Sequence, residues 1–341
     1  MPDIFSDPSE RGPIVDNVAA TRGVAPWVIE KDLWVCWTLA RLNEIEGMPQ
    51  LTFKGGTSLS KVHGLIDRFS EDIDLTFSRD GWGFEGERDP LRTDLSGKKR
   101  QALVDEISGR STKVVSDVVV PGLCAACRGH IGLSGWSVEI DAADAQAVLF
   151  TFPNPTAAYG YGQPQVKIEF GARGDPWPTS RKVIRPYVEE DYDGTAPAAV
   201  TEVTALDPER TFWEKVTLLH ALHHGTAAKP DKNLHRLSRH MYDVHRIWKT
   251  TALRTSLLDS TLLQAVVDNK TVFFRETKAR YDLVTKFELN CAPGDALAKL
   301  LRDDFAAMES MFFPGSTVPA FDEALATLKE IDATVSGWKV P

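Results

Sequence analysis

The segment FKGGTSLSKVHGLIDRFSEDIDLTF, residues 53–77, decides the fold of this 341-residue chain. A strand-like run over residues 51–54 ends at the double glycine 55–56, and apolar residues then recur at helical spacing: Leu59, Val62 and Ile66. Residues 72–77 alternate strictly between polar and apolar side chains, which predicts a half-buried strand. The predicted order is therefore strand, glycine turn, helix and strand.

The glycine turn predicts a cradle for the phosphates of a nucleoside triphosphate (NTP), formed by Gly55, Gly56, Thr57, Ser58 and Lys61. Glycines allow the backbone to approach a ligand closely, and free N–H groups at the start of a helix favour an anion. The Ser58 hydroxyl is a further donor, and Lys61 follows about one turn later. The segment is not a Walker P-loop, because serine precedes this lysine and valine follows it.

Asp72 and Asp74 share one face of the predicted strand, roughly 6–7 Å apart. Two such carboxylates can hold two divalent ions at the roughly 3.5–4 Å spacing of two-metal phosphoryl-transfer sites. Mg²⁺ (or Mn²⁺) suits these oxygen ligands. The acid-x-acid triplet alone is not specific, since 48 acidic residues in 341 give about six or seven by chance. The order of the surrounding elements carries the prediction.

A third carboxylate is expected from a neighbouring strand. In VKIEF, residues 166–170, the apolar side chains face one way, while Lys167 and Glu169 face the other. Glu169 is preferred as the third metal ligand, because Lys167 beside it could meet a phosphate. Glu139 and Asp141 in WSVEID are the rivals.

Mixed α/β periodicity is expected over residues 1–200, and helical periodicity over residues 201–341, which predicts two domains. Segments 78–100 and 174–197 are predicted to be loops, since they are rich in Gly, Asp, Arg or Pro. Helices are predicted at 26–42 and 99–120, and further strands at 136–141, 147–152 and 165–172.

The net charge of −9 excludes a uniformly basic coat for nucleic acid. A local basic strip comprises Lys229, Lys232, Arg236 and Arg239. We interpret it first as a solvated turn and helix face, with contact to an RNA backbone as the alternative. No apolar run approaches the roughly 20 residues that span a bilayer, so no membrane contact is expected. The first residues lack the features of a secretory signal, and four cysteines are too few for a disulfide scaffold. We therefore expect a cytoplasmic protein.

The string GGTSLSK followed by RFSEDIDL resembles the AbiEii/AbiGii family of bacterial toxins, which includes the MenT toxins. The order of its elements resembles the opening of polymerase-β-type nucleotidyltransferases. Further segments resemble motifs of the family: Glu30-Lys31-Asp32, Lys167–Arg173, Glu214-Lys215 and Arg239–Asp243.

The resemblance implies an α+β (α/β) fold, with a nucleotidyltransferase core on a mixed sheet and a helical C-terminal domain. It implies transfer of nucleotides from NTP to RNA, best known for the 3′ acceptor end of tRNA. The protein would be the toxin of a type IV-like toxin–antitoxin pair, opposed by an antitoxin. Ser58 would contact the nucleotide phosphates, while Asp72 and Asp74 would hold metal.

The resemblance also implies roles for Ser70, Lys215 and Asp243. Ser70 lies where some family members have a serine that accepts phosphate. Lys215 would stabilise triphosphate charge, and Asp243 would orient that lysine or act as a base on the acceptor hydroxyl. Two alternatives stay open: a phosphotransferase that modifies Ser70 or a partner, and a catalytically silent nucleotide- or RNA-binding module.

Overall fold

The computed structural model describes residues 4–156, 158, 163–226 and 236–338. The chain divides into two compact units. The first comprises Met1–Val62, Phe69–Asp89 and Ser96–Leu206; the second comprises His63–Arg68, Pro90–Leu95 and Asp207–Pro341. The division after Leu206 lies beyond the boundary expected at residues 200–201, because the sheet's last strand in the sequence ends there.

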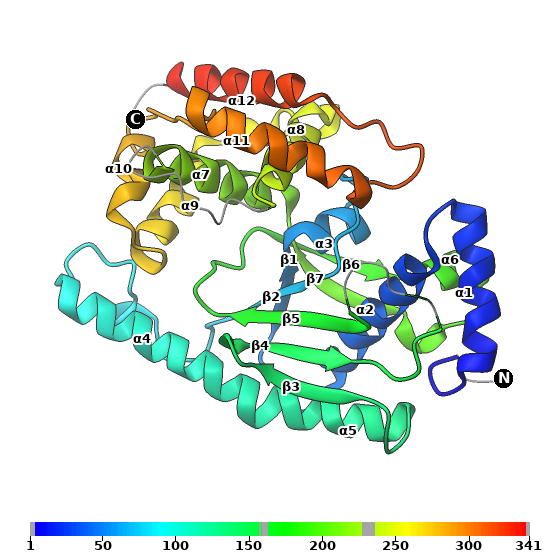
Figure 1. Cartoon of the computed structure of the whole chain (residues 1–341). Helices are drawn as coiled ribbons and strands as arrows, with labels where there is room; N and C mark the ends of the chain where they lie inside the picture. The colour runs from blue at the N-terminus through cyan, green and yellow to red at the C-terminus, as the bar shows by residue number, and fades with distance from the viewer. Residues whose placement is uncertain (1–3, 157, 159–162, 227–235, 339–341) are drawn as a thin grey trace. The chain divides into compact units, whose positions relative to one another are not determined.

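The first unit is built on a mixed sheet, which among the described residues has seven strands in the order β3-β4-β5-β2-β1-β7-β6 (Figure 1). The strands are β1 Leu51–Lys54, β2 Ile73–Phe77, β3 Ser137–Asp141, β4 Asp144–Thr151, β5 Gln165–Gly171, β6 Thr179–Ile184 and β7 Thr201–Leu206. The pairs β1/β7 and β2/β5 are parallel, and the other neighbours are antiparallel. The predicted α/β fold is confirmed.

One face of the sheet is apolar and packs against helix α2, Pro26–Glu44. Trp34 and Trp37 of α2 stack on Phe152 and Phe150 at the β4 side of the sheet. Side chains alternate along each strand, so polar residues of β1, β2 and β5 lie on the opposite face. The other helices of this unit are α1 Pro8–Arg22, α3 Gly55–Lys61, α4 Gly97–Val114, α5 Val120–His130 and α6 Tyr187–Asp191.

The helix that follows the double glycine is shorter than predicted. It ends at Lys61, so Val62 and Ile66 lie outside it. Gly64, with a φ of 59°, turns the chain in the left-handed region and prevents a longer helix. The strand predicted over residues 72–77 is confirmed from Ile73 onward.

Two other expectations are corrected by the structure. The helix predicted at 99–120 continues through a π-helical turn, Val115–Val119, into α5, and the turn lies beside Pro121, which lacks a backbone N–H. The segment 174–197 is not only a loop, because it contains β6 and α6. β6 lies at the edge of the sheet, where exposed charged side chains are tolerated, so its apolar signal is weak.

The second unit is helical. Its helices are α7 Pro208–Thr226, α8 Ser238–Lys249, α9 Ser260–Phe273, α10 Tyr281–Val284, α11 Asp295–Ala306 and α12 Phe321–Ser336. Within the described ranges of both units, every helix is too short or too polar to cross a bilayer.

His220 of α7 is a buried histidine of the second unit. Its Nε2 lies 3.1 Å from the carbonyl oxygen of Arg280, and its Nδ1 accepts a hydrogen bond of 3.0 Å from the backbone N–H of Asn290. An Nδ1 that accepts must be unprotonated, so this geometry fits the neutral ring. Burial lowers the pKa of His220 to about 4.

His220 should make the second unit sensitive to acid. The unfolded chain binds a proton near pH 6.5, whereas the folded chain resists protonation until about pH 4, so stability should fall as the pH drops between these values. The contribution is at most about 3 kcal/mol. Urea unfolding at several pH values should show a flatter dependence for His220→Gln than for the unchanged chain; equal slopes would contradict this account.

Candidate functional site

Asp74 points its carboxylate at the glycine turn. Gly55 has a φ of 80°, and a Cβ placed on it would clash with Oδ2 of Asp74 and lie 2.8 Å from its Cγ. Only a residue without a side chain allows this approach. The acid of β2 and the turn after β1 therefore form one site within the first unit.

Thr57 ties helix α3 to the segment that carries the other acid. Its Oγ1 donates a hydrogen bond of 2.5 Å to the carbonyl oxygen of Asp72 and lies 3.0 Å from Oγ of Ser70. Asp72 directly precedes β2 and is half-buried, as is Ser70. The backbone of Asp72 and the hydroxyl of Ser70 thus lie next to the predicted cradle.

Among the described residues, the buried hydroxyl of Ser58 lacks a hydrogen-bond partner that a bound ligand would supply. Ser58 is 2% exposed, and within the described part of the chain its Oγ has no hydrogen-bond partner. A buried hydroxyl without a partner is unfavourable. A phosphate oxygen bound beside α3 would satisfy it, which supports the predicted phosphate contact of Ser58.

The polar face of the sheet places Lys54, Asp74 and Glu169 in one row. Lys54 of β1 pairs with Asp74 of β2 in the antiparallel register, and Asp74 pairs with Glu169 of β5 in the parallel register. Residues paired in this way have neighbouring side chains on the same face. Glu169 is therefore the carboxylate-bearing neighbour of Asp74 on β5.

Lys167 connects Glu169 with the rival acid Asp141. Its Nζ lies 2.7 Å from Oε1 of Glu169 and 3.8 Å from Oδ2 of Asp141. The hydrogen bond with Glu169 raises the pKa of Lys167, and Asp72 and Asp141 add to the effect. The second rival, Glu139, is exposed on the edge strand β3.

Asp72 and Asp74 are the predicted ligands of a divalent cation. Among the described residues, no three His, Cys, Asp or Glu side chains form a ready-made metal cluster. Mg²⁺ commonly takes only one or two protein carboxylates and completes its shell with water and substrate phosphates. The Asp74 carboxylate lies beside the glycine turn, and metal binding by Asp72, Asp74 and Glu169 stays a prediction.

Lys61 has protein partners inside the first unit. Its ammonium lies 2.9 Å from Oδ1 of Asp32, 3.4 Å from Glu190 and 3.7 Å from the ring centre of Tyr187. Only 5% of its side chain is exposed. These protein groups engage the Lys61 ammonium, and its contact with a phosphate stays a prediction.

Lys215 and Asp243 contact each other in the second unit. Nζ of Lys215 lies 2.9 Å from Oδ2 of Asp243, and Arg68 donates two hydrogen bonds of 2.8 and 2.7 Å to the same carboxylate. Burial would raise the pKa of Asp243, but Arg68 and Lys215 outweigh it and hold the pKa below its ordinary value. This favours the orienting role of Asp243 over the role of base; participation of the pair in catalysis stays a prediction.

Three residues near the diacid, Lys54, Lys31 and Glu71, received no individual role in the sequence analysis. Lys54 lies beside Asp74 because β1 pairs with β2, and the sequence alone does not show this pairing. The ammonium of Lys31, in α2, forms an ion pair with Glu71, which lies between Ser70 and Asp72 in the sequence. A usable signal existed for Lys31, because it stands among the apolar residues of a helix whose charged side chains must find partners.

Comparison with protein families gives one match. The family described as nucleotidyl transferase AbiEii toxin of type IV toxin–antitoxin systems matches residues 37–327. The match covers β1 to β7, including the glycine turn and the diacid, and continues into α12 of the second unit. No curated protein matches the chain.

Gly55→Ala should inactivate nucleotidyl transfer by pushing the Asp74 carboxylate away from the turn. A shift of about 1 Å in a reacting group can lower the rate about a hundredfold. Gly47→Ala is the matched control, because Gly47 also has a positive φ of 76° but has nothing within 4 Å of an added Cβ. Both variants should lose about 1–2 kcal/mol from backbone strain. Equal activity of the two in a transfer assay would contradict the role of this contact.

Asp243→Asn should strongly destabilise the second unit, because it leaves Arg68 and Lys215 buried without their counter-charge. The expected loss is about 3–5 kcal/mol in urea unfolding. Asp67→Asn removes an ion pair with Arg246 that is partly exposed and 2.8 Å long, and should cost less than about 1 kcal/mol. Similar losses for the two variants would disprove the proposed difference in burial.

Proposed function

Because the chain belongs to the AbiEii family of nucleotidyl transferase toxins of type IV toxin–antitoxin systems, we propose that it transfers a nucleoside monophosphate from NTP to RNA, at the 3′ acceptor end of tRNA. Family membership makes the chain a nucleotidyltransferase and a toxin with a nucleotide substrate and an antitoxin partner. The observation that carries the proposed location of the reaction is the carboxylate of Asp74 lying against Gly55.

The proposed reaction joins the terminal hydroxyl oxygen of the RNA to the α-phosphorus of NTP. The bond between that phosphorus and the oxygen bridging to the β-phosphate breaks, and pyrophosphate leaves. The hydroxyl proton passes to water. Such a transfer depends mainly on positioning and on stabilising charge at the phosphoryl group.

The described residues of the first unit supply these functions. The Ser58 hydroxyl donates to a phosphate oxygen, which gives its buried Oγ the partner it lacks. Asp72 and Asp74 hold divalent ions, with Glu169 as a third ligand on the neighbouring strand. When bound, a pair of Mg²⁺ or Mn²⁺ ions would supply charge stabilisation and favour ionisation of the attacking hydroxyl.

RNA is proposed as acceptor on two grounds. The resemblance to the family points to the tRNA end, and a single-stranded 3′ end can reach half-buried carboxylates without a broad basic surface. That geometry suits a chain with a net charge of −9. Of the basic strip named above, Lys229 and Lys232 lie outside the described residues, so its contact with RNA stays a prediction.

A second candidate reaction is phosphoryl transfer to Ser70. Its hydroxyl lies 3.0 Å from that of Thr57, which is next to Ser58 in α3. In that reaction the Ser70 oxygen would attack the γ-phosphorus of NTP and release the diphosphate. The two reactions differ in which phosphate remains on the product.

Asp72→Ala and Asp74→Asn should each lower incorporation of label from α-labelled NTP into total tRNA at least about a hundredfold, because removing a metal ligand forfeits several kcal/mol of charge stabilisation. Circular dichroism should show that both variants remain folded. Asp80→Asn, an exposed acid just beyond β2, is the control and should retain activity.

The label distinguishes the reactions. Label from α-labelled NTP in RNA supports nucleotidyl transfer, whereas label from γ-labelled NTP in the protein, lost in Ser70→Ala, supports the second candidate. Full incorporation by Asp72→Ala would rule out the proposed use of the diacid. If the unchanged chain forms no labelled product, a silent binding module is favoured instead.

A further inference from the structure

Helix α2 contains three consecutive charged residues, Glu30, Lys31 and Asp32, and all three are buried. Successive residues of a helix point about 100° apart, so the three side chains face different neighbours. Glu30 accepts a hydrogen bond of 3.0 Å from Nε of Arg11, which holds α1. The other two face the segments that carry the nucleotide site.

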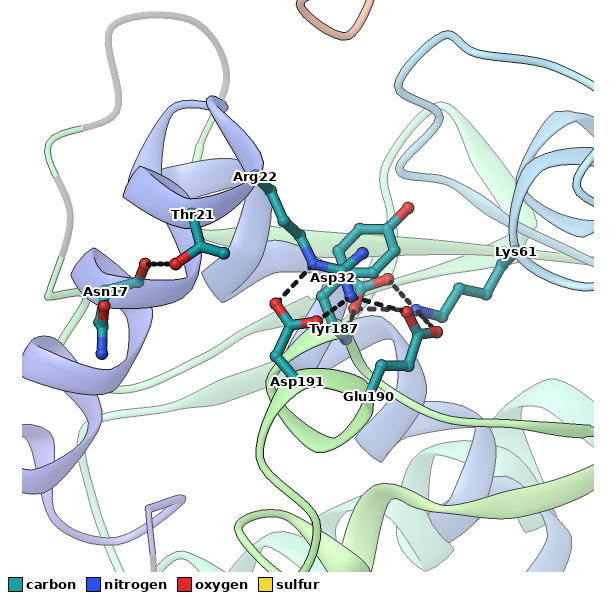
Figure 2. Close-up of polar contacts among 8 residues, drawn as sticks. All are labelled: Asn17, Thr21, Arg22, Asp32, Lys61, Tyr187, Glu190 and Asp191. Atoms are coloured by element: carbon teal, nitrogen blue, oxygen red, sulfur yellow. Dashed lines mark hydrogen bonds and ion pairs between the residues drawn. The ribbon is translucent and has the colours of Figure 1, made fainter.

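Asp32 holds the end of helix α3. Figure 2 shows its carboxylate between the ammonium of Lys61, at 2.9 Å, and the backbone N–H of Tyr187, which donates to it over 2.7 Å. Lys61 also contacts Glu190 and the ring of Tyr187. Since Lys61 is the last residue of α3, these contacts fix the helix at its C-terminal end.

Lys31 holds the segment that leads into the diacid. Its ammonium forms an ion pair with Glu71 and lies 3.3 Å from the carbonyl oxygen of Gln163. Glu71 is followed directly by Asp72. Adjacent residues of one rigid helix thus hold the two halves of the site, the diacid segment through Lys31 and helix α3 through Asp32.

Helix α3 needs such support. Its seven residues make only about two turns, and helices this short are not stable by themselves. Thr57 fixes its first turn to Asp72, and Lys61 fixes its last residue to α2 and α6. Without the second attachment, α3 could rotate about the first, and the hydroxyl of Ser58 would move with it.

We propose that Asp32 and Lys61 are positioning residues for nucleotide binding: their buried ion pair keeps α3 in the orientation in which Ser58 meets a phosphate. Lys31 positions Asp72 in the same way through Glu71. The inference rests on the proposed function, because it concerns the same phosphate cradle. It assigns Lys61 to the support of the cradle instead of to the phosphate.

The test compares Asp32→Asn, Lys61→Met and the double variant in the full chain. Hydrogen exchange of a peptide covering residues 53–62 should be about tenfold faster in all three, with the sheet peptide covering 165–171 unchanged. Binding of a non-hydrolysable nucleoside triphosphate with Mg²⁺, each base in turn, should weaken at least about tenfold. The turnover number should fall further, up to about a hundredfold.

The pattern across variants distinguishes support from direct contact. If the pair acts as a unit, the two single variants and the double variant lose similar affinity, because breaking either partner frees α3. If Lys61 → Met alone loses affinity while exchange at 53–62 stays slow, Lys61 contacts the phosphate and the proposal is overturned. Unchanged exchange and affinity in all variants overturn it as well.

Arg22→Met is the matched control. Arg22, the last residue of α1, contacts Glu190, Asp191 and the ring of Tyr187, and these three partners belong to α6 (Figure 2). Arg22→Met should leave hydrogen exchange at residues 53–62 and nucleotide affinity unchanged. If a single variant fails to fold because it leaves a buried charge unpaired, the double variant decides. If the unchanged chain labels no RNA, the proposed function fails, while exchange and nucleotide affinity still decide this proposal.

Discussion

The approach of the Asp74 carboxylate to Gly55 is the constraint on which the rest of the site depends. It requires a residue without a side chain, a backbone in the left-handed region at 80°, and a β2 strand whose register places position 74 beside the end of β1. The first condition concerns the residue type, the second the backbone conformation and the third the pairing of two strands. Because all three meet at one point, the acid is fixed relative to α3, which starts at the same glycine.

Near this contact the first unit buries several charged side chains, among them Glu30, Lys31 and Asp32. Unpaired charges in such positions would be very unfavourable, and even paired ones gain little over apolar packing. Glu30, Lys31 and Asp32 therefore contribute less to net stability than to selecting one arrangement of the segments they hold. Each has a specific partner from another element, so a shifted arrangement would leave a buried charge unpaired.

The sequence predicted those parts of the fold that depend on residues close together in the chain. Alternation at 72–77 and the glycines at 55–56 depend only on neighbouring residues, and the structure has a strand and a turn there. The partners of Lys61 could not be predicted, because Asp32 and Glu190 lie 29 and 129 positions away and meet only through the fold. The edge strand β6 was missed because its first four residues, 179–182, are all polar or charged, so no alternation marks it.

An acidic chain that binds triphosphate must obtain its positive charge locally. On the polar face of the sheet the acids Asp72, Asp74, Glu169 and Asp141 are accompanied by Lys54 and Lys167, which leaves two net negative charges. A pair of divalent cations reverses that sign, and the nucleotide then meets a positive site on a protein whose overall charge of −9 repels it. Nucleotide and metal should therefore bind cooperatively, because the carboxylates and the triphosphate repel each other unless a cation lies between them.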